Sequence, residues 1–235
     1  MSKSEAGSKE AKVNAKDVLW YIPNQIGYLR VVTMILSLFL MAKHPLWTMW
    51  VYGVSCLLDA LDGTMARKYG QTSSFGAVLD MVTDRSTTTA LICFLCVAYP
   101  AWSPIFQLLV ALDISSHYIH MYATLSTGSQ SHKAIEKEQW LLNLYYTKRK
   151  VLFSICALNE MFYMGLYIMA FPQFRSYAVP VLGQVHIGGV IALVCLPGYI
   201  FKQIANVVQL NRAALMLANK DAAEATERRL KQKHN

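Results

Sequence analysis

The sequence predicts an all-α, polytopic membrane protein with six transmembrane helices, an N-terminal interfacial segment and a cytosolic C-terminal helix. Of its 235 residues, 54% are hydrophobic and only 15% are charged, and the mean hydropathy is positive. Such a composition is typical of integral membrane proteins. The apolar residues also gather into runs long enough to cross a bilayer, separated by short polar segments.

The N-terminal region is polar before it becomes apolar. Residues 1–16 contain charges and no apolar core of a signal peptide, so we predict a disordered polar tail there. Trp20 and Tyr21 then precede Pro23, and paired aromatic residues at this place are typical of a segment lying at the membrane interface.

Six apolar runs follow and give the six predicted spans. They lie at residues 26–43, 46–58, 77–99, 102–125, 151–171 and 179–205. The second run reaches the roughly 20 residues that a bilayer requires only if it continues to Ala66, which brings its end near the membrane surface. We therefore predict a membrane domain over residues 17–205 and, because Ala, Leu, Lys, Arg and Glu dominate the rest, a basic cytosolic helix over residues 206–235.

The basic residues predict the orientation. Most of the 22 Lys and Arg precede the first run, follow the second, lie between the fourth and fifth, or end the chain, whereas the opposite side has only Lys43 and Arg175. The positive-inside rule then places both termini and the turn after the second run in the cytosol. The net charge of +8 is a topology signal on this interpretation, and its spacing does not indicate a nucleic-acid partner.

Four carboxylates flank the turn between the second and third runs. Asp59 and Asp62 are three residues apart and Asp80 and Asp84 are four apart, so each pair shares a helix face. Between them, Gly70 and residues 71–74 favour a turn. An ionised Asp in a bilayer costs about 2.5 to 3.5 kcal/mol. Four together therefore indicate a compensating cation, and hard oxygen ligands favour Mg²⁺ or Mn²⁺, with two ions about 3.5 to 4 Å apart suiting phosphoryl transfer.

Neighbouring residues fit the same chemistry. Gly63 and Gly76 permit a close approach by a ligand, Arg67 offers a fixed charge to phosphate oxygens, and Asp84 is the candidate base. The structural alternative is that the acids cap helices and pair with Arg67, Lys68 and Arg85 at the interface. Helix-dipole stabilisation of about 0.3 to 1 kcal/mol is too small to explain four converging carboxylates.

The segment also carries a family resemblance. It fits the pattern D(x)2DG(x)2AR(x)8G(x)3D(x)3D, and so resembles the CDP-alcohol phosphotransferases. The matching positions are Asp59, Asp62, Gly63, Ala66, Arg67, Gly76, Asp80 and Asp84. The resemblance implies a six-helix, dimeric membrane enzyme in which an alcohol attacks the β-phosphate of a CDP-linked donor and CMP leaves. It also implies that Asp59, Asp62, Asp80 and Asp84 form the metal site, that Asp84 is in addition the base, and that the other four positions line the cytidine and diphosphate pocket.

The acceptor depends on blocks outside this pattern. PNQIGYLR (23–30), LDISSHYIH (112–120), SHK (131–133), YYTKR (145–149) and NEMFY (159–163) are similar to eukaryotic family members that use CDP-diacylglycerol and myo-inositol. This similarity implies location in the endoplasmic reticulum. Two alternatives stay open: another acceptor, such as glycerol 3-phosphate, or an ion channel or transporter. The latter is disfavoured because the acids lie at one edge and no internal repeat is present.

Five polar residues are candidates for binding the acceptor or a phosphate. Ser131, His132, Lys133 and Arg149 lie on the predicted cytosolic loop and offer hydrogen-bond donors. Arg30, inside the first span, requires a carboxylate or phosphate partner. The alternative for Lys133 and Arg149 is that they mark topology and touch anionic membrane lipids.

One further polar trio lies in the fourth run. Asp113, His117 and His120 share a helix face, so a second metal site is one hypothesis. The other is that the trio braces a neighbouring helix through Asn159 and Glu160, as buried polar groups between membrane helices commonly do.

Overall fold

A computed structural model describes residues 13–127, 148–174, 177–179 and 183–234. Six long helices account for most of them: α2 (Ile22–Met41), α3 (Pro45–Lys68), α4 (Ser74–Ala98), α5 (Ser103–Thr127), α7 (Arg149–Met169) and α8 (Ile187–His234). A short helix, α1 (Ala15–Leu19), precedes them, and two 3₁₀ turns, η1 (Pro100–Trp102) and η3 (Pro172–Phe174), follow α4 and α7. The helical fold class is confirmed, and α1 begins at Ala15, one residue before the end of the predicted polar tail.

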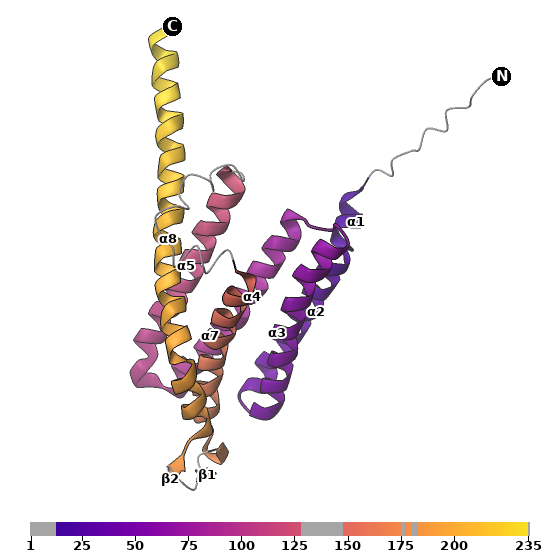
Figure 1. Cartoon of the computed structure of the whole chain (residues 1–235), viewed down its shortest axis with the longest axis vertical. Coiled ribbons are helices and arrows are strands. Elements are labelled where there is room, and N and C mark those ends of the chain that lie inside the picture. Colours follow the sequence, from indigo (N-terminus) through magenta and orange to yellow (C-terminus); the bar gives the residue numbers. More distant parts are fainter. Residues whose placement is uncertain (1–12, 128–147, 175–176, 180–182, 235) are drawn as a thin grey trace, which may run out of the picture.

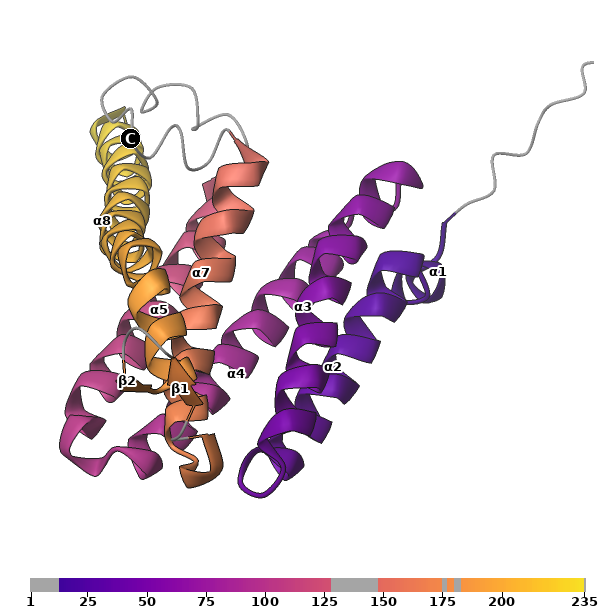
Figure 2. The ribbon, with the colours of Figure 1, turned by 60° about the horizontal axis from the view of Figure 1, so that its bottom comes forward.

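Helix α4 lies between two groups of helices (Figures 1 and 2). On one side α2 packs against α3, and on the other α8 packs against α5 and α7, while α4 contacts α2, α5 and α7. Buried residues of α2, α3, α4, α5 and α7 form the hydrophobic core: Met41, Tyr52, Leu91, Ile92, Leu95, Phe106, Tyr163, Tyr167 and Ile168. Because α4 touches both groups, side chains on α4 can connect the two halves of the bundle.

Four helices, α2, α4, α7 and α8, are long and apolar enough to cross a membrane, which identifies an integral membrane protein. Large apolar side chains on the outside, such as Phe39 (79% exposed) and Leu193 (70% exposed), suit contact with lipid. Helices α3 and α5 have 24 and 25 residues but are not among these four candidate spans. The six-span topology therefore stays a prediction.

The beginning of the sixth predicted span is wrong. Two antiparallel strands lie here instead, β1 (Tyr177–Val179) paired with β2 (Gly183–Val185), and α8 starts only at Ile187. The apolar composition of this stretch fits a strand as well as a helix, and Pro180 and Gly183 interrupt it. Helix α8 then continues without a break across the predicted boundary at residue 206.

One end of the bundle gathers several chain segments. Helix α1, the turn between α3 and α4 and the long C-terminal part of α8 all lie at this end, whereas β1 and β2 lie at the other (Figure 1). With 48 residues, α8 is about 72 Å long, more than twice the hydrocarbon thickness of a bilayer, so its C-terminal part extends beyond the bundle.

Candidate active site

The turn between α3 and α4 is built by specific backbone contacts. Gly70 has φ of 64°, a left-handed conformation that glycine adopts without a steric penalty. The N–H of Gln71 donates to the carbonyl of Ala66 at 2.9 Å and closes the end of α3. Ser73 then caps α4, because its Oγ accepts from the N–H of Gly76 at 3.0 Å. The turn lies where the sequence predicts it, and it aligns the acid-bearing ends of both helices.

The four acids meet around one guanidinium. Arg30 of α2 lies beneath them, with its side chain only 3% exposed. Its Nη2 lies 2.6 Å from Asp59 Oδ1 and also donates to Asp84 Oδ1. Its Nη1 lies 2.7 Å from Asp62 Oδ2 and 2.6 Å from Asp80 Oδ1. Four carboxylates thus share one internal cation, which leaves three formal negative charges that Arg30 does not balance.

Three of these acids have the geometry of a cation site. One oxygen each from Asp59, Asp62 and Asp80 lie within 4.8 Å of one another. Oxygens around a single Mg²⁺ at about 2.1 Å are at most about 4 Å apart, so small side-chain movements bring these three into range. Asp59 and Asp80 are also open to solvent, with 37% and 46% of their side chains exposed. The donor set therefore fits a hard divalent cation.

The trio in α5 has other partners. The carboxylate of Asp113 accepts hydrogen bonds from Arg85, and the Nδ1 of His117 lies 2.8 Å from the backbone oxygen of Asp113. Within the part of the chain that the structure describes, no group of metal-ligating side chains includes these residues. Asp113 does brace neighbouring helices, through Arg85 of α4 and Asn206 of α8 rather than through Asn159 and Glu160.

Glu160 of α7 links the two acid-bearing helices below the site. Its carboxylate accepts from the hydroxyl of Tyr52 on α3 and, at 3.0 Å, from that of Thr88 on α4. Thr88 lies one turn beyond Asp84, and Tyr52 lies two turns before Asp59. This contact among α3, α4 and α7 therefore fixes how the acid-bearing turns of α3 and α4 are aligned along the bundle.

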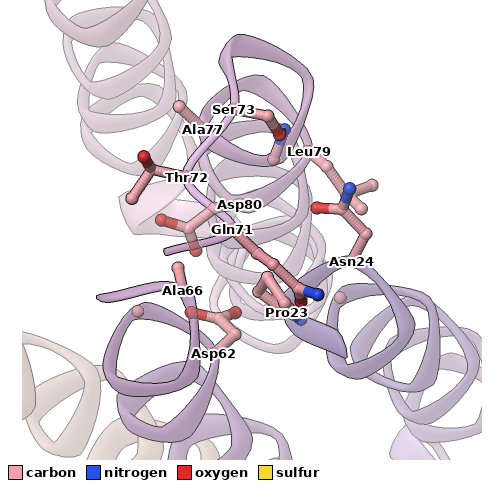
Figure 3. A pocket seen from close by; sticks show the side chains of 13 residues that line it. Pro23, Asn24, Asp62, Ala66, Gln71, Thr72, Ser73, Ala77, Leu79 and Asp80 are labelled. Atoms are coloured by element: carbon pink, nitrogen blue, oxygen red, sulfur yellow. The ribbon is translucent and has the colours of Figure 1, made fainter. Parts of the chain in front are cut away.

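A cavity of about 170 Å³ opens beside the acids (Figure 3). At about 30 Å³ per water, this volume has room for about six water-sized groups, enough for part of a polar headgroup. Its lining residues from α3, α4 and their turn are Asp62, Gly63, Ala66, Gln71, Thr72, Ser73, Gly76, Ala77, Leu79 and Asp80. The opposite wall comes from Pro23, Asn24 and Gly27 of α2, which sequence reasoning did not assign to the site. The polar Asn24 within an apolar helix was the available signal.

The remaining predicted residues lie elsewhere. Arg67 is exposed and does not line the cavity; its guanidinium lies beside Gly63, where an added Cβ would be 3.3 Å from Nη1. Ser131, His132 and Lys133 fall outside the described residues. Arg149 is the first residue of α7, and its side chain is likewise not described.

Comparison with known proteins gives a consistent result. Residues 20–172 match the family described as CDP-alcohol phosphatidyltransferase. The chain is 58% identical to the CDP-diacylglycerol–inositol 3-phosphatidyltransferase of Saccharomyces cerevisiae, over 95% of this chain and 97% of that protein. It is 49% identical to the protein of the same name from Candida albicans (92% and 90% covered) and 37% identical to that from Homo sapiens (91% and 99% covered). No solved structure matches the chain significantly.

Proposed function

Because the chain belongs to the CDP-alcohol phosphatidyltransferase family, we propose that it transfers the phosphatidyl group of CDP-diacylglycerol to myo-inositol, giving phosphatidylinositol and CMP. The observation that carries this proposal is similarity over nearly the whole chain to relatives named for that reaction, at 37 to 58% identity. The convergence of all four signature carboxylates supports it from the structure.

Asp59, Asp62 and Asp80 are proposed to hold Mg²⁺ or Mn²⁺, two ions in total, with Asp84 completing the site. When bound, such ions neutralise the diphosphate and stabilise the leaving phosphate. Arg30 supports the acids from below and keeps their oxygens directed toward a common centre. The three negative charges that Arg30 leaves unbalanced are what draw cations to this place.

Asp84 is proposed to take the proton from the acceptor. A hydroxyl oxygen of inositol forms the new bond to the β-phosphorus, and the bond from that phosphorus to the CMP oxygen breaks, so CMP leaves with the electron pair. The hydroxyl proton passes to the Asp84 carboxylate. One third of the Asp84 side chain is exposed, so the carboxylate is accessible from the site.

The cavity beside Asp62 and Asp80 is proposed to bind the cytidine and diphosphate of the donor. Gly63, Ala66 and Gly76 line it and have little or no side chain, so a ligand can approach the helix backbones closely. Arg67 is proposed to reach the phosphates from the rim. The proposed acceptor contacts stay Ser131, His132, Lys133 and Arg149, whereas Arg30, the fifth candidate, is engaged by the four acids and buried beneath them.

The membrane setting completes the proposal. The shared location of α1, the α3–α4 turn and the end of α8 supports a cytosolic active site with both termini cytosolic. The relatives support residence in the endoplasmic reticulum membrane, and a homodimer is proposed from the family resemblance.

The test is an acceptor panel. Purified protein receives CDP-diacylglycerol, Mg²⁺ or Mn²⁺, and either myo-inositol or glycerol 3-phosphate, and both CMP and the lipid product are measured. We expect phosphatidylinositol to predominate, and preference for glycerol 3-phosphate would reassign the acceptor. Asp84→Asn should lower kcat by about 10² to 10⁴-fold and leave appreciable donor binding, whereas Asp59→Asn should weaken metal and donor binding together. Near-normal turnover by the Asp84 variant would remove its role as the base.

A further inference from the structure

Asp84 lies between two guanidinium groups. One oxygen accepts from Arg30, and the other lies 3.4 Å from Nη2 of Arg85, the next residue in α4. Charge-assisted N–H···O contacts are normally about 2.7 to 2.9 Å long. The Arg85 contact is therefore loose, although both groups belong to neighbouring residues and carry opposite charges.

Asp113 of α5 explains why Arg85 stays at this distance. Nη1 of Arg85 lies 2.9 Å from one Asp113 oxygen and 3.0 Å from the other. Asn206 of α8, only 1% exposed, donates to the same carboxylate at 3.3 Å. The buried Lys202 of α8 also interacts electrostatically with Asp113 and Arg85. Arg85 is thus held by a carboxylate that α5 and α8 fix in place.

We propose that Asp113 is a positioning residue that holds Arg85 away from Asp84 and so keeps the Asp84 carboxylate oriented and available to the acceptor hydroxyl. The proposal rests on the proposed function, in which Asp84 takes the acceptor proton. With Asp113 neutralised, the ion-pair partner that remains to Arg85 among the described residues is Asp84, because Glu160 acts on Arg85 electrostatically without an ion-pair contact. A guanidinium binds a carboxylate best through two parallel contacts. Asp84 then becomes part of a closed ion pair.

Two other roles for Asp113 give different results. If the Arg85–Asp113 pair only fastens α4 to α5, its loss lowers stability and activity together. If Asp113 binds the acceptor directly, its loss raises the KM for the acceptor, and changing Arg85 cannot repair that defect. A positioning role predicts that loss of Asp113 lowers kcat without changing the affinity for the donor. It also predicts that removing the Arg85 charge as well raises kcat again.

The experiment is a double-mutant cycle of Asp113→Asn, Arg85→Gln and the double variant. The exposed Asp221→Asn is the matched control for the same chemical change. CMP release is measured well below the unfolding temperature of each variant, with KM for both substrates and binding of CDP-diacylglycerol. We expect Asp113→Asn to lose about ten- to a hundredfold in kcat with donor binding within twofold of wild type. The double variant should turn over at least ten times faster than Asp113→Asn.

A double variant no faster than Asp113→Asn overturns the proposal, as does an Asp113→Asn variant in which only the acceptor KM rises. Loss of donor binding in step with loss of folded protein also overturns it, since that result assigns the pair a structural role. Wild-type protein, assayed in parallel, distinguishes failure of this proposal from failure of the proposed function. If the wild type releases no CMP from CDP-diacylglycerol, the proposed function fails and this inference fails with it.

Discussion

Gly76 is where the wall of the cavity is most sensitive to one added methyl group. A Cβ at Gly76 would lie 2.7 Å from Asn24 Oδ1 and 3.1 Å from Ser73 Oγ. Asn24 cannot simply turn away, because it is 1% exposed and its Nδ2 donates to the carbonyl of Val18 at 2.6 Å. Gly76→Ala must therefore displace Asn24, break its contact with α1 and disturb the Ser73 cap.

The expected cost follows from these contacts. Losing the Asn24 hydrogen bond and disturbing a helix cap together cost about 2 to 3 kcal/mol, and the better helix propensity of alanine returns about 1 kcal/mol. The net loss of about 1 to 2 kcal/mol corresponds to a fall in Tm of about 2 to 8 °C for a chain of this size. We also expect a higher KM for CDP-diacylglycerol, because Gly76 and Asn24 both line the cavity.

Gly53→Ala provides the matched control. Gly53 lies inside α3, and an added Cβ there meets nothing within 4 Å. Helix propensity then acts alone and should raise stability by up to about 1 kcal/mol. Thermal unfolding of the two variants in the same detergent should therefore shift in opposite directions. An unchanged Tm and KM in Gly76→Ala would refute the steric argument, and an equal fall in both variants would show a general response to alanine.

Two further perturbations test the polar contacts around the site. Arg30→Gln leaves four carboxylates without their internal cation, so in a buffer that contains a metal chelator it should lower the free energy of unfolding by about 3 to 5 kcal/mol. Millimolar Mn²⁺ should reduce this loss. Thermal unfolding of the variant with and without Mn²⁺ measures the loss and its reduction, and equal Tm values in the two buffers would contradict the cation-site interpretation. Glu160→Ala should lower the free energy of unfolding by about 1 to 3 kcal/mol, because it leaves the Tyr52 and Thr88 hydroxyls without their acceptor. Glu160→Gln keeps an acceptor oxygen and should lower it by less. Equal Tm values for these two variants would argue against the hydrogen-bond explanation.

Local features of the fold could be predicted from the sequence. Apolar runs located the six long helices, and Gly70 with the residues after it located the turn between α3 and α4. The spacing of Asp59 with Asp62 and of Asp80 with Asp84 gave the faces on which the acids lie. These features depend on residues within one or two helical turns, which periodicity reports directly.

Contacts between distant residues could not be predicted in the same way. Arg30 is 54 residues from Asp84, and Arg85 is 28 from Asp113. Helical periodicity shows which residues share a face, but not which other helix that face contacts. The wall formed by Asn24 and Gly27 depends on how α2 packs against α3 and α4, and the periodicity of the sequence does not show that packing.

The charge balance of the cluster separates a functional interpretation from a structural one. In a structural network the acids would be balanced by basic neighbours, and the candidates in sequence were Arg67, Lys68 and Arg85. Among the ion pairs of the described residues, the acids contact Arg30 and, loosely through Asp84, Arg85, whereas Arg67 and Lys68 take no part. Arg85 is itself held by Asp113. The cluster is therefore left strongly anionic by its own fold, at an end where the acids are partly exposed. Such an arrangement is costly unless cations from solution bind there, so the excess charge is better explained as a binding site than as a brace.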